Sequence, residues 1–407
     1  MDRTLFLLLV AVLPIMQPSL VAIDGYPLAW ADAVFLMLAV VIAISIFAGR
    51  LRILWTSWNT AVALFVAATI VSALAAPDRR HSLIKAAGTA YLAVLGALSA
   101  HYSRQLEMRK PLLLAWLVAT VVTITACAAG VVLFFARAPA NPFLYGYGSL
   151  PAGPYPRVMG LFTNANMLCS YLNAAGLVVL SGERAGLIRR AIAVPVVVAV
   201  CLSAVLTLSP NLGGLALAGS LWFAATTPRG YGLRAATIRW AGTAAAVVFV
   251  VAILVSPTVL NHAEARDWDG IEPSSRVQTW VAAAEVFREH PWVGAGPGAE
   301  VAHVAYVNAS HGYELLTDAH NTWLSVLAHT GLLGFVPFAV AIGMLIARMR
   351  QRLDVTTRGA WRSGLELALL AGLLYPSLSG SFEDSRHVWI LMGMVHAAQT
   401  PGSAPTE

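Results

Sequence analysis

Apolar segments about as long as a bilayer is thick recur along nearly the whole chain, with polar connections between them. A helix needs roughly 20 apolar residues to cross the hydrocarbon core of a membrane. Each such segment must be helical, because lipid offers no partners for backbone amides and carbonyls. The alternating pattern of a transmembrane β-strand is not seen in these segments. The pattern therefore predicts an all-α polytopic membrane protein.

About twelve transmembrane helices are expected, in two groups. Nine fall within residues 1–258 and three within residues 319–400, and one large polar loop, 259–318, lies between the groups. The tail 401–407 is rich in Pro, Ser and Thr, and we expect it to be disordered. The expected spans are 4–23, 28–48, 55–76, 83–100, 111–136, 158–181, 191–208, 211–226, 238–258, 319–347, 361–380 and 386–400.

Charge is sparse and mostly basic. Only 11% of the residues are charged, against about 25% in soluble domains, and 24 of the 26 basic residues are arginines. With a cytoplasmic N-terminus, 17 basic residues fall on the cytoplasmic side and 9 on the other, as the positive-inside rule requires. Both termini are then cytoplasmic and the large loop lies outside. The net charge of +6 is therefore interpreted as a topology signal, and no nucleic-acid partner is expected.

Some of the nine outer basic residues are expected to bind an anion such as the diphosphate of a lipid carrier. Arg157 stands at the membrane boundary, and Asn166 enters the apolar zone, where an amide needs partners. Lys85 lies in the outer part of its span, where it either snorkels to the interface or faces a polar cavity. The acidic connection 379–384 is expected to be a solvated loop.

A surface helix is expected to begin near Pro273–Arg276 in the large loop, with an apolar stripe at helical spacing. Arg276 in its first turn opposes the helix dipole, which a bound anion would offset. A solvated arginine is the plainer alternative. Arg288 is a further candidate for a phosphate. The glycines that follow, Gly294, Gly296 and Gly298, are interpreted as a structural turn, because no Lys-Ser/Thr pair follows them.

Five histidines crowd into 40 residues of this region, but their spacing does not match a zinc site, and neither a metal nor a cofactor is expected. His320 differs from the others because it stands where the loop meets a span, between Asp318 and Asn321. A histidine is suited to take a proton from a sugar hydroxyl near neutral pH. The alternative is an interfacial histidine that caps a helix.

Taken in order, these motifs resemble the O-antigen ligase and polymerase superfamily of bacterial inner-membrane glycosyltransferases. One motif is Arg-x2-Gly-x-Phe-x-Asn-x-Asn at 157–166, and the next is Ser275-Arg276. The last is His320-Asn321, followed after nine residues by Gly331-x2-Gly334. The chain departs from the family at 209–214, where Ser209 is not followed by an arginine. The resemblance implies a GT-C-type helical bundle with a large periplasmic loop.

The resemblance also implies a metal-independent, inverting transfer of a glycan from undecaprenyl diphosphate to an acceptor hydroxyl on the periplasmic face. His320 would be the general base, and Arg157 and Arg276 would hold the diphosphate with help from Arg288 and Lys85. The residues that would support the acceptor or the base are Asp318, Asn321 and Asn166.

An O-antigen ligase acting on a lipid A–core sugar is the expected function, because the chain reads as one compact bundle without an added soluble domain. A polymerase of the same superfamily is the alternative. A transporter or flippase, from another class, would need charged or broken helices at mid-membrane, where Asp32 and Glu366 are the acids well inside spans. The expected partners are the lipid-linked glycan, the lipid A–core acceptor and membrane lipid. The expected location is the bacterial inner membrane, with the active site facing the periplasm.

Overall fold

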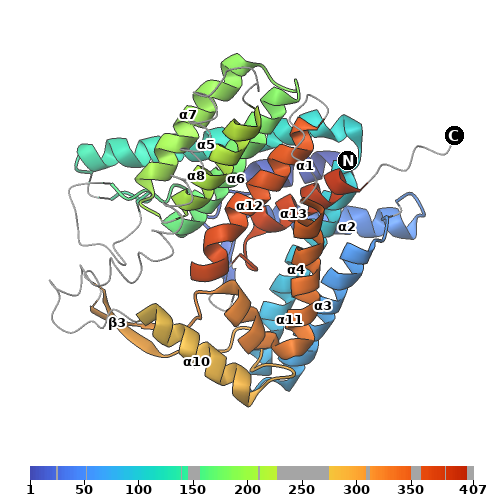
Figure 1. Cartoon of the computed structure of the whole chain (residues 1–407), viewed down its shortest axis with the longest axis vertical. Helices are drawn as coiled ribbons and strands as arrows, with labels where there is room; N and C mark the ends of the chain where they lie inside the picture. Colours follow the sequence, from blue (N-terminus) through green and yellow to red (C-terminus); the bar gives the residue numbers. More distant parts are fainter. Residues whose placement is uncertain are drawn as a thin grey trace.

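The computed structural model describes residues 1–23, 26–51, 53–138, 140–144, 156–209, 211–226, 275–308, 312–349, 359–380 and 382–400. These residues are mostly helical (Figure 1). The helices are α1 (Asp2–Val12), α2 (Trp30–Phe47), α3 (Ser57–Ala75), α4 (Arg79–Ser103), η1 (Leu106–Met108), α5 (Arg109–Phe135), α6 (Ala165–Arg184), α7 (Arg190–Leu206), α8 (Leu212–Thr226), α10 (Ser275–Glu289), α11 (Thr322–Met349), α12 (Ala360–Ser379) and α13 (Arg386–Gln399).

Within the described part of the chain, six helices are long and apolar enough to cross a membrane, namely α2, α3, α4, α5 with η1, α6 and α11. The protein is therefore a helical polytopic membrane protein. The helices coincide with most of the expected spans to within a few residues. The expected span 238–258 and the tail 401–407 lie outside the described residues.

The expected first span, 4–23, is wrong in its extent. Helix α1 ends at Val12, and at 1.5 Å per residue its 11 residues cover only about 16 Å. Pro14 and Pro18 follow, and a proline nitrogen cannot donate the hydrogen bonds that would continue a helix. The chain then forms an antiparallel hairpin of β1 (Val21–Ile23) and β2 (Tyr26–Leu28). A second hairpin, β3 (Val304–Asn308) with β4 (Gly312–Leu316), lies in the large loop.

Two buried helices organise the bundle. Helix α6 packs against α12, α7, α5 and α8, and α13 packs along α4. Small residues allow these backbones to approach closely, as in many membrane helix pairs. A Cβ placed on Gly393 of α13 would lie 2.2 Å from the carbonyl oxygen of Gly96 in α4, and one on Gly364 of α12 would lie 2.1 Å from Cβ of Ser181 in α6.

The two acids expected inside spans are both paired. Asp32 lies in the first turn of α2, and its two carboxylate oxygens are each 2.8 Å from Nη2 of Arg386. Nε of Arg386 also donates to the Tyr91 hydroxyl at 3.2 Å. Glu366 in α12 accepts from Nε of Arg362 at 2.9 Å. Asp32 therefore connects α2 with α13, whereas Glu366 pairs with an arginine of its own helix, and both charges are locally compensated.

Helix α11 is interrupted at Gly331, whose backbone is left-handed with φ 59°. The amides after the break donate to the segment that follows α10: Leu332 to the carbonyl of Pro291 at 2.9 Å, and Leu333 to that of Trp292 at 3.1 Å. The carbonyls before the break accept from the same segment, Ala328 from the Ala295 amide at 2.9 Å and His329 from the Gly296 amide at 3.1 Å. The break is thus filled by backbone from the large loop.

The α10 and β3 elements lie at the end of the bundle opposite the two chain termini (Figure 1). The interruption of α11 holds the large loop against that end of the bundle.

We predict that Gly331→Ala destabilises the protein, because a left-handed alanine costs about 1–2 kcal/mol and its Cβ would lie 2.4 Å from the Trp292 carbonyl carbon. Gly343→Ala, in the same helix, is the matched control, because its Cβ would meet no atom within 4 Å. Thermal unfolding of the detergent-solubilised protein, followed by tryptophan fluorescence, measures the difference. Equal unfolding temperatures for the two variants would contradict the role assigned to the break.

Candidate active site

A cavity of about 400 Å³ lies between α3, α4 and α11, beside the segment that follows α10. Polar side chains from five separate stretches of sequence line it, so the tertiary fold alone assembles the site. The ionisable residues in its wall are His81, Lys85, Glu300, Asp318, His329, Glu383 and Asp384.

Helix α4 contributes two basic side chains, His81 and Lys85, to the wall of the cavity. Its N-cap is Asp78, whose side chain accepts from the His81 amide at 3.0 Å. His81 and Lys85 are four residues apart and therefore share one face of the helix. The cavity wall includes both side chains. The sequence left two possibilities for Lys85, snorkelling to the interface or facing a polar cavity. The structure shows the second.

His329 of α11 connects this helix to the segment that follows α10 through hydrogen bonds. Its Nε2 lies 3.1 Å from the Ala299 carbonyl, and its Nδ1 lies 3.3 Å from Oγ of Ser325. With the ring proton on Nε2, that nitrogen donates to the carbonyl and Nδ1 accepts from the serine. Both ring nitrogens are then used in positioning the wall of the cavity.

The acidic connection between α12 and α13 is not the solvated loop that we expected. Phe382 is fully buried, and its amide donates to Oγ1 of Thr322 at 3.0 Å. The Glu383 carbonyl accepts from Nε1 of Trp389 at 2.7 Å. These contacts turn the side chains of Glu383 and Asp384 into the cavity wall. Sequence reasoning missed them, although two adjacent acids between outer helix ends were the available signal.

The surroundings raise the pKa of both carboxyls. Burial raises the pKa of Glu383 well above its usual 4.5, and the nearby Asp384 charge adds to this effect. The Asp384 side chain is exposed to the open cavity, yet partial desolvation there still raises its pKa, while the charge of Lys85 counteracts the rise. A carboxyl group with a raised pKa can act as a proton donor.

Asp318, His320 and Asn321 lie at the start of α11. Asp318 lines the cavity, whereas His320 is not among the cavity-lining residues and adopts a left-handed backbone with φ 48°. The helix cap is Asn321, because its Oδ1 accepts from the amides of Trp323 at 3.1 Å and Leu324 at 3.2 Å. The left-handed residue next to this cap is His320. Strained backbone of this kind is concentrated at functional sites.

Arg157 and Asn166 form part of a second polar region, at the N-terminal end of α6. Arg157 is buried, and its Nε donates to the Thr207 carbonyl at 3.1 Å. The Asn166 carbonyl accepts from Nδ2 of Asn211 at 2.8 Å, and the Asn211 carbonyl accepts from Nδ2 of Asn173 at 2.7 Å. The stretch that departs from the family pattern thus lies against the Arg157 region.

The acidic connection lies between the two polar regions. Asp384 lines the cavity beside Lys85 and also a small space of about 20 Å³ beside Phe162 and Met167. Phe162 and Met167 belong to the chain around the Arg157–Asn166 motif. The structure therefore brings Lys85 together with Asp318, and Arg157 together with Asn166, but Arg157 does not line the described cavity.

The remaining candidates lie on α10, which begins at Ser275 as the sequence predicts. The Arg276 side chain lies outside the described part of the structure. Arg288 is exposed in the last turn, where a cation is favourable for the helix dipole. Among the described residues, no group of three or more His, Cys, Asp or Glu side chains is placed to hold a metal ion.

Residues 169–339 match the family model described as O-antigen ligase. The family resemblance is thereby confirmed. The matched segment runs from α6 into α11 and includes Arg276, Asp318 and His320. No curated protein matches the chain.

We predict that Glu383→Gln weakens the pH dependence of stability. The folded-state pKa of Glu383 is raised, so the folded chain binds the proton more tightly than the unfolded chain. The contribution of Glu383 to the free energy of unfolding is therefore fully present below about pH 4.5. It is lost as the pH rises through the folded-state pKa. The unfolding temperature of the variant should fall less between pH 5 and pH 8 than that of the wild type, by about 2 °C or more.

The matched control for this measurement is Glu300→Gln, in the wall of the same cavity, whose side chain is 64% exposed. It should follow the wild-type profile. Parallel profiles for wild type and Glu383→Gln would show that the Glu383 environment does not favour the protonated form.

Proposed function

We propose that the protein is an O-antigen ligase, a GT-C-type bundle of about twelve spans that transfers a glycan from undecaprenyl diphosphate to a lipid A–core sugar hydroxyl. The observation that carries the proposal is the polar cavity whose wall includes Asp318, in a chain whose residues 169–339 match the O-antigen ligase family model. Its volume of about 400 Å³ falls within the range of small-molecule sites.

The cavity has the chemistry of a carbohydrate site. Asp318, Glu383 and Asp384 supply oxygens that accept hydrogen bonds from sugar hydroxyls. Lys85 supplies a cation for the carrier diphosphate or for a phosphate on the acceptor. In the proposed mechanism, His320 takes the proton from the acceptor hydroxyl as that oxygen attacks the anomeric carbon from the side opposite the diphosphate. The configuration at that carbon is then inverted.

Fixed cations favour the departure of the diphosphate, because they stabilise the negative charge that develops on it. We assign this role to Arg157 and Arg276, with Arg288 and Lys85 in support. The burial of Arg157 strengthens its part in the proposal, because a desolvated guanidinium interacts more strongly with phosphate than a solvated one. Asn321, which caps α11 beside His320, and Asn166, at the start of α6, are assigned a supporting role.

The arrangement of the chain supports a periplasmic site with both termini in the cytoplasm. The termini lie at the end of the bundle opposite α10 and β3 (Figure 1). Placing the termini inside puts α10, the hairpin and the large loop on the periplasmic face of the inner membrane, where the lipid-linked glycan and the lipid A–core acceptor meet.

A polymerase of the same superfamily is the alternative, since it would use the same donor. A transporter is less well supported. Its signature would be uncompensated charge at mid-membrane beside a broken helix. The break in α11 is filled by loop backbone, and Asp32 and Glu366 are both paired.

We predict that His320→Ala abolishes glycan transfer while expression and topology remain intact. The control is His290→Ala, an exposed histidine just after α10. Each variant is expressed in a deletion strain, and its lipopolysaccharide is separated on a gel. Loss of every O-antigen band, with polymer retained on the lipid carrier, indicates a ligase. Core with a single repeat indicates a polymerase, and activity within about threefold of wild type removes the base role of His320.

We predict that Arg157→Ala and Arg276→Ala both weaken the use of the lipid-linked donor, and that lysine restores it only in part, because a guanidinium can contact phosphate at two points. Arg157→Ala should also lower the unfolding temperature, since its Nε bonds the Thr207 carbonyl. The measurement is the transfer rate as a function of donor concentration. A variant with unchanged donor dependence would exclude that arginine from the diphosphate site.

A further inference from the structure

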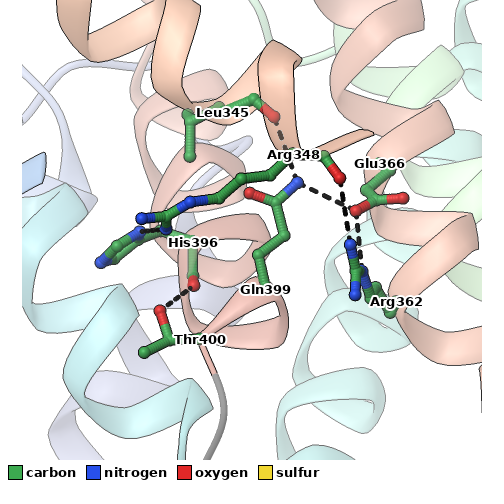
Figure 2. A network of polar contacts seen from close by, with 7 residues as sticks. All are labelled: Leu345, Arg348, Arg362, Glu366, His396, Gln399 and Thr400. Atoms are coloured by element: carbon green, nitrogen blue, oxygen red, sulfur yellow. Dashed lines mark hydrogen bonds and ion pairs between the residues drawn. The ribbon is translucent and has the colours of Figure 1, made fainter. Parts of the chain in front are cut away.

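A second buried polar cluster lies at the opposite end of the bundle, where the ends of α11 and α13 meet the start of α12 (Figure 2). One half of it is closed and charge-balanced. Glu366 accepts from Nε of Arg362 and from Nε2 of Gln399, both at 2.9 Å. Nη2 of Arg362 also donates to the Arg348 carbonyl at 3.1 Å. This half ties α11, α12 and α13 together and leaves no net charge.

The other half is cationic and centres on His396, whose side chain is almost fully buried and stacks on Trp58 with ring centroids 5.0 Å apart. Two arginines approach opposite edges of the imidazole. Nη2 of Arg104 lies 3.2 Å from Nε2, and Nη1 of Arg348 lies 3.5 Å from Nδ1. An arginine can only donate hydrogen bonds, and a neutral imidazole has one acceptor nitrogen. The ring can therefore satisfy only one of the two guanidinium groups.

Thr56 indicates which nitrogen carries the ring proton. Its Oγ1 lies 3.1 Å from Nε2 of His396, and its hydroxyl proton is directed to Oδ1 of Asn59. With that proton used, the threonine oxygen accepts from Nε2–H. Nδ1 then accepts from Arg348, and Arg104 faces a nitrogen that already carries hydrogen. In the other tautomer Arg104 is satisfied and Arg348 is not.

The connection from α4 to α5 contains further donors without acceptors. Within the described residues, Nε of Arg104 and Nε of Arg109 are both buried and have no hydrogen-bond partner. No carboxylate in the described part of the chain lies within 4.0 Å of Arg104 or Arg348. Buried guanidinium groups are costly unless they are paired and hydrogen-bonded.

The stretch of sequence that begins at Arg348 also has more basic than acidic residues. Residues 348–362 contain five arginines and a single acid, Asp354. Leu106, two residues after Arg104, is 70% exposed, as expected of a side chain that meets lipid. Donors with no acceptor, a surplus of positive charge and an adjacent apolar surface together fit an anion at the membrane boundary.

We propose that Arg104 and Arg348 bind a phosphate-class anion at the end of the bundle where α4, α11 and α13 end. The anion is either the headgroup of an anionic phospholipid or free phosphate. It supplies the acceptors that His396 cannot, and it connects the ends of α4, α11 and α13. The site lies at the opposite end from the proposed active site and does not depend on the transfer reaction.

The test uses the full-length protein, stripped of lipid in mild detergent. Its thermal unfolding is followed by tryptophan fluorescence while phosphatidylglycerol, phosphatidylcholine or inorganic phosphate is titrated. A ligand that binds the folded state raises the unfolding temperature, and the rise increases with ligand concentration relative to the Kd. We expect phosphatidylglycerol to stabilise the wild type and phosphatidylcholine to have little effect. Stabilisation by inorganic phosphate as well would identify a general phosphate site, and stabilisation by phosphatidylglycerol alone a lipid headgroup site.

Arg104→Gln and Arg348→Gln should each weaken the apparent affinity for phosphatidylglycerol by at least about tenfold, the ratio that corresponds to about 1.4 kcal/mol. Arg50→Gln is the matched control, because it removes one exposed arginine just after α2. Arg104→Lys keeps the charge and should bind within about threefold of wild type, which makes the test independent of whether the glutamine variants fold. No stabilisation by any phosphate ligand, or equal affinity in Arg104→Gln and Arg50→Gln, would overturn the proposal.

Discussion

The break in α11 at Gly331 is the constraint on which the α10 end of this protein depends. A helix inside a membrane cannot leave its amides and carbonyls without partners. Here the segment Pro291–Gly296 supplies them, donating to the carbonyls before the break and accepting from the amides after it. The large loop is therefore fixed to the bundle by backbone hydrogen bonds. This places Asp318 and the acidic connection around one cavity, with His320 at the adjoining end of α11.

Ionisable side chains in this bundle are either paired within it or gathered at its two ends. Carboxylates within helices are paired with arginines. Asp32 of α2 pairs with Arg386 of α13, and Glu366 pairs with Arg362 one turn earlier in the same helix. Other ionisable groups accumulate beyond such pairs at both ends of the bundle. At the α10 end they line the cavity that contains Lys85 and Asp384, and at the other end they form the cationic cluster around His396.

The glycines of the large loop have a structural role that their sequence motif alone did not reveal. Gly294 and Gly331 lie against each other's backbones: a Cβ on Gly294 would be 2.3 Å from the His329 carbonyl carbon, and one on Gly331 would be 2.4 Å from that of Trp292. Both residues have positive φ. The interpretation of the glycines as a structural turn agrees with this geometry, but the sequence did not indicate that the turn would complete a broken helix.

The sequence by itself determined which segments are helices, because apolar runs of bilayer length leave few other ways to satisfy the backbone. It also identified the motifs of the O-antigen ligase family and the helix start at Ser275. We did not predict the early end of α1, although Pro14 and Pro18 were its signal, or the two hairpins, whose strands are near neighbours in the chain. The placement of Glu383 and Asp384 depends instead on contacts between residues far apart in the chain, such as the Phe382 amide with Thr322. Only the tertiary structure decided which polar side chains share a cavity, because burial and charge pairing are properties of that packing.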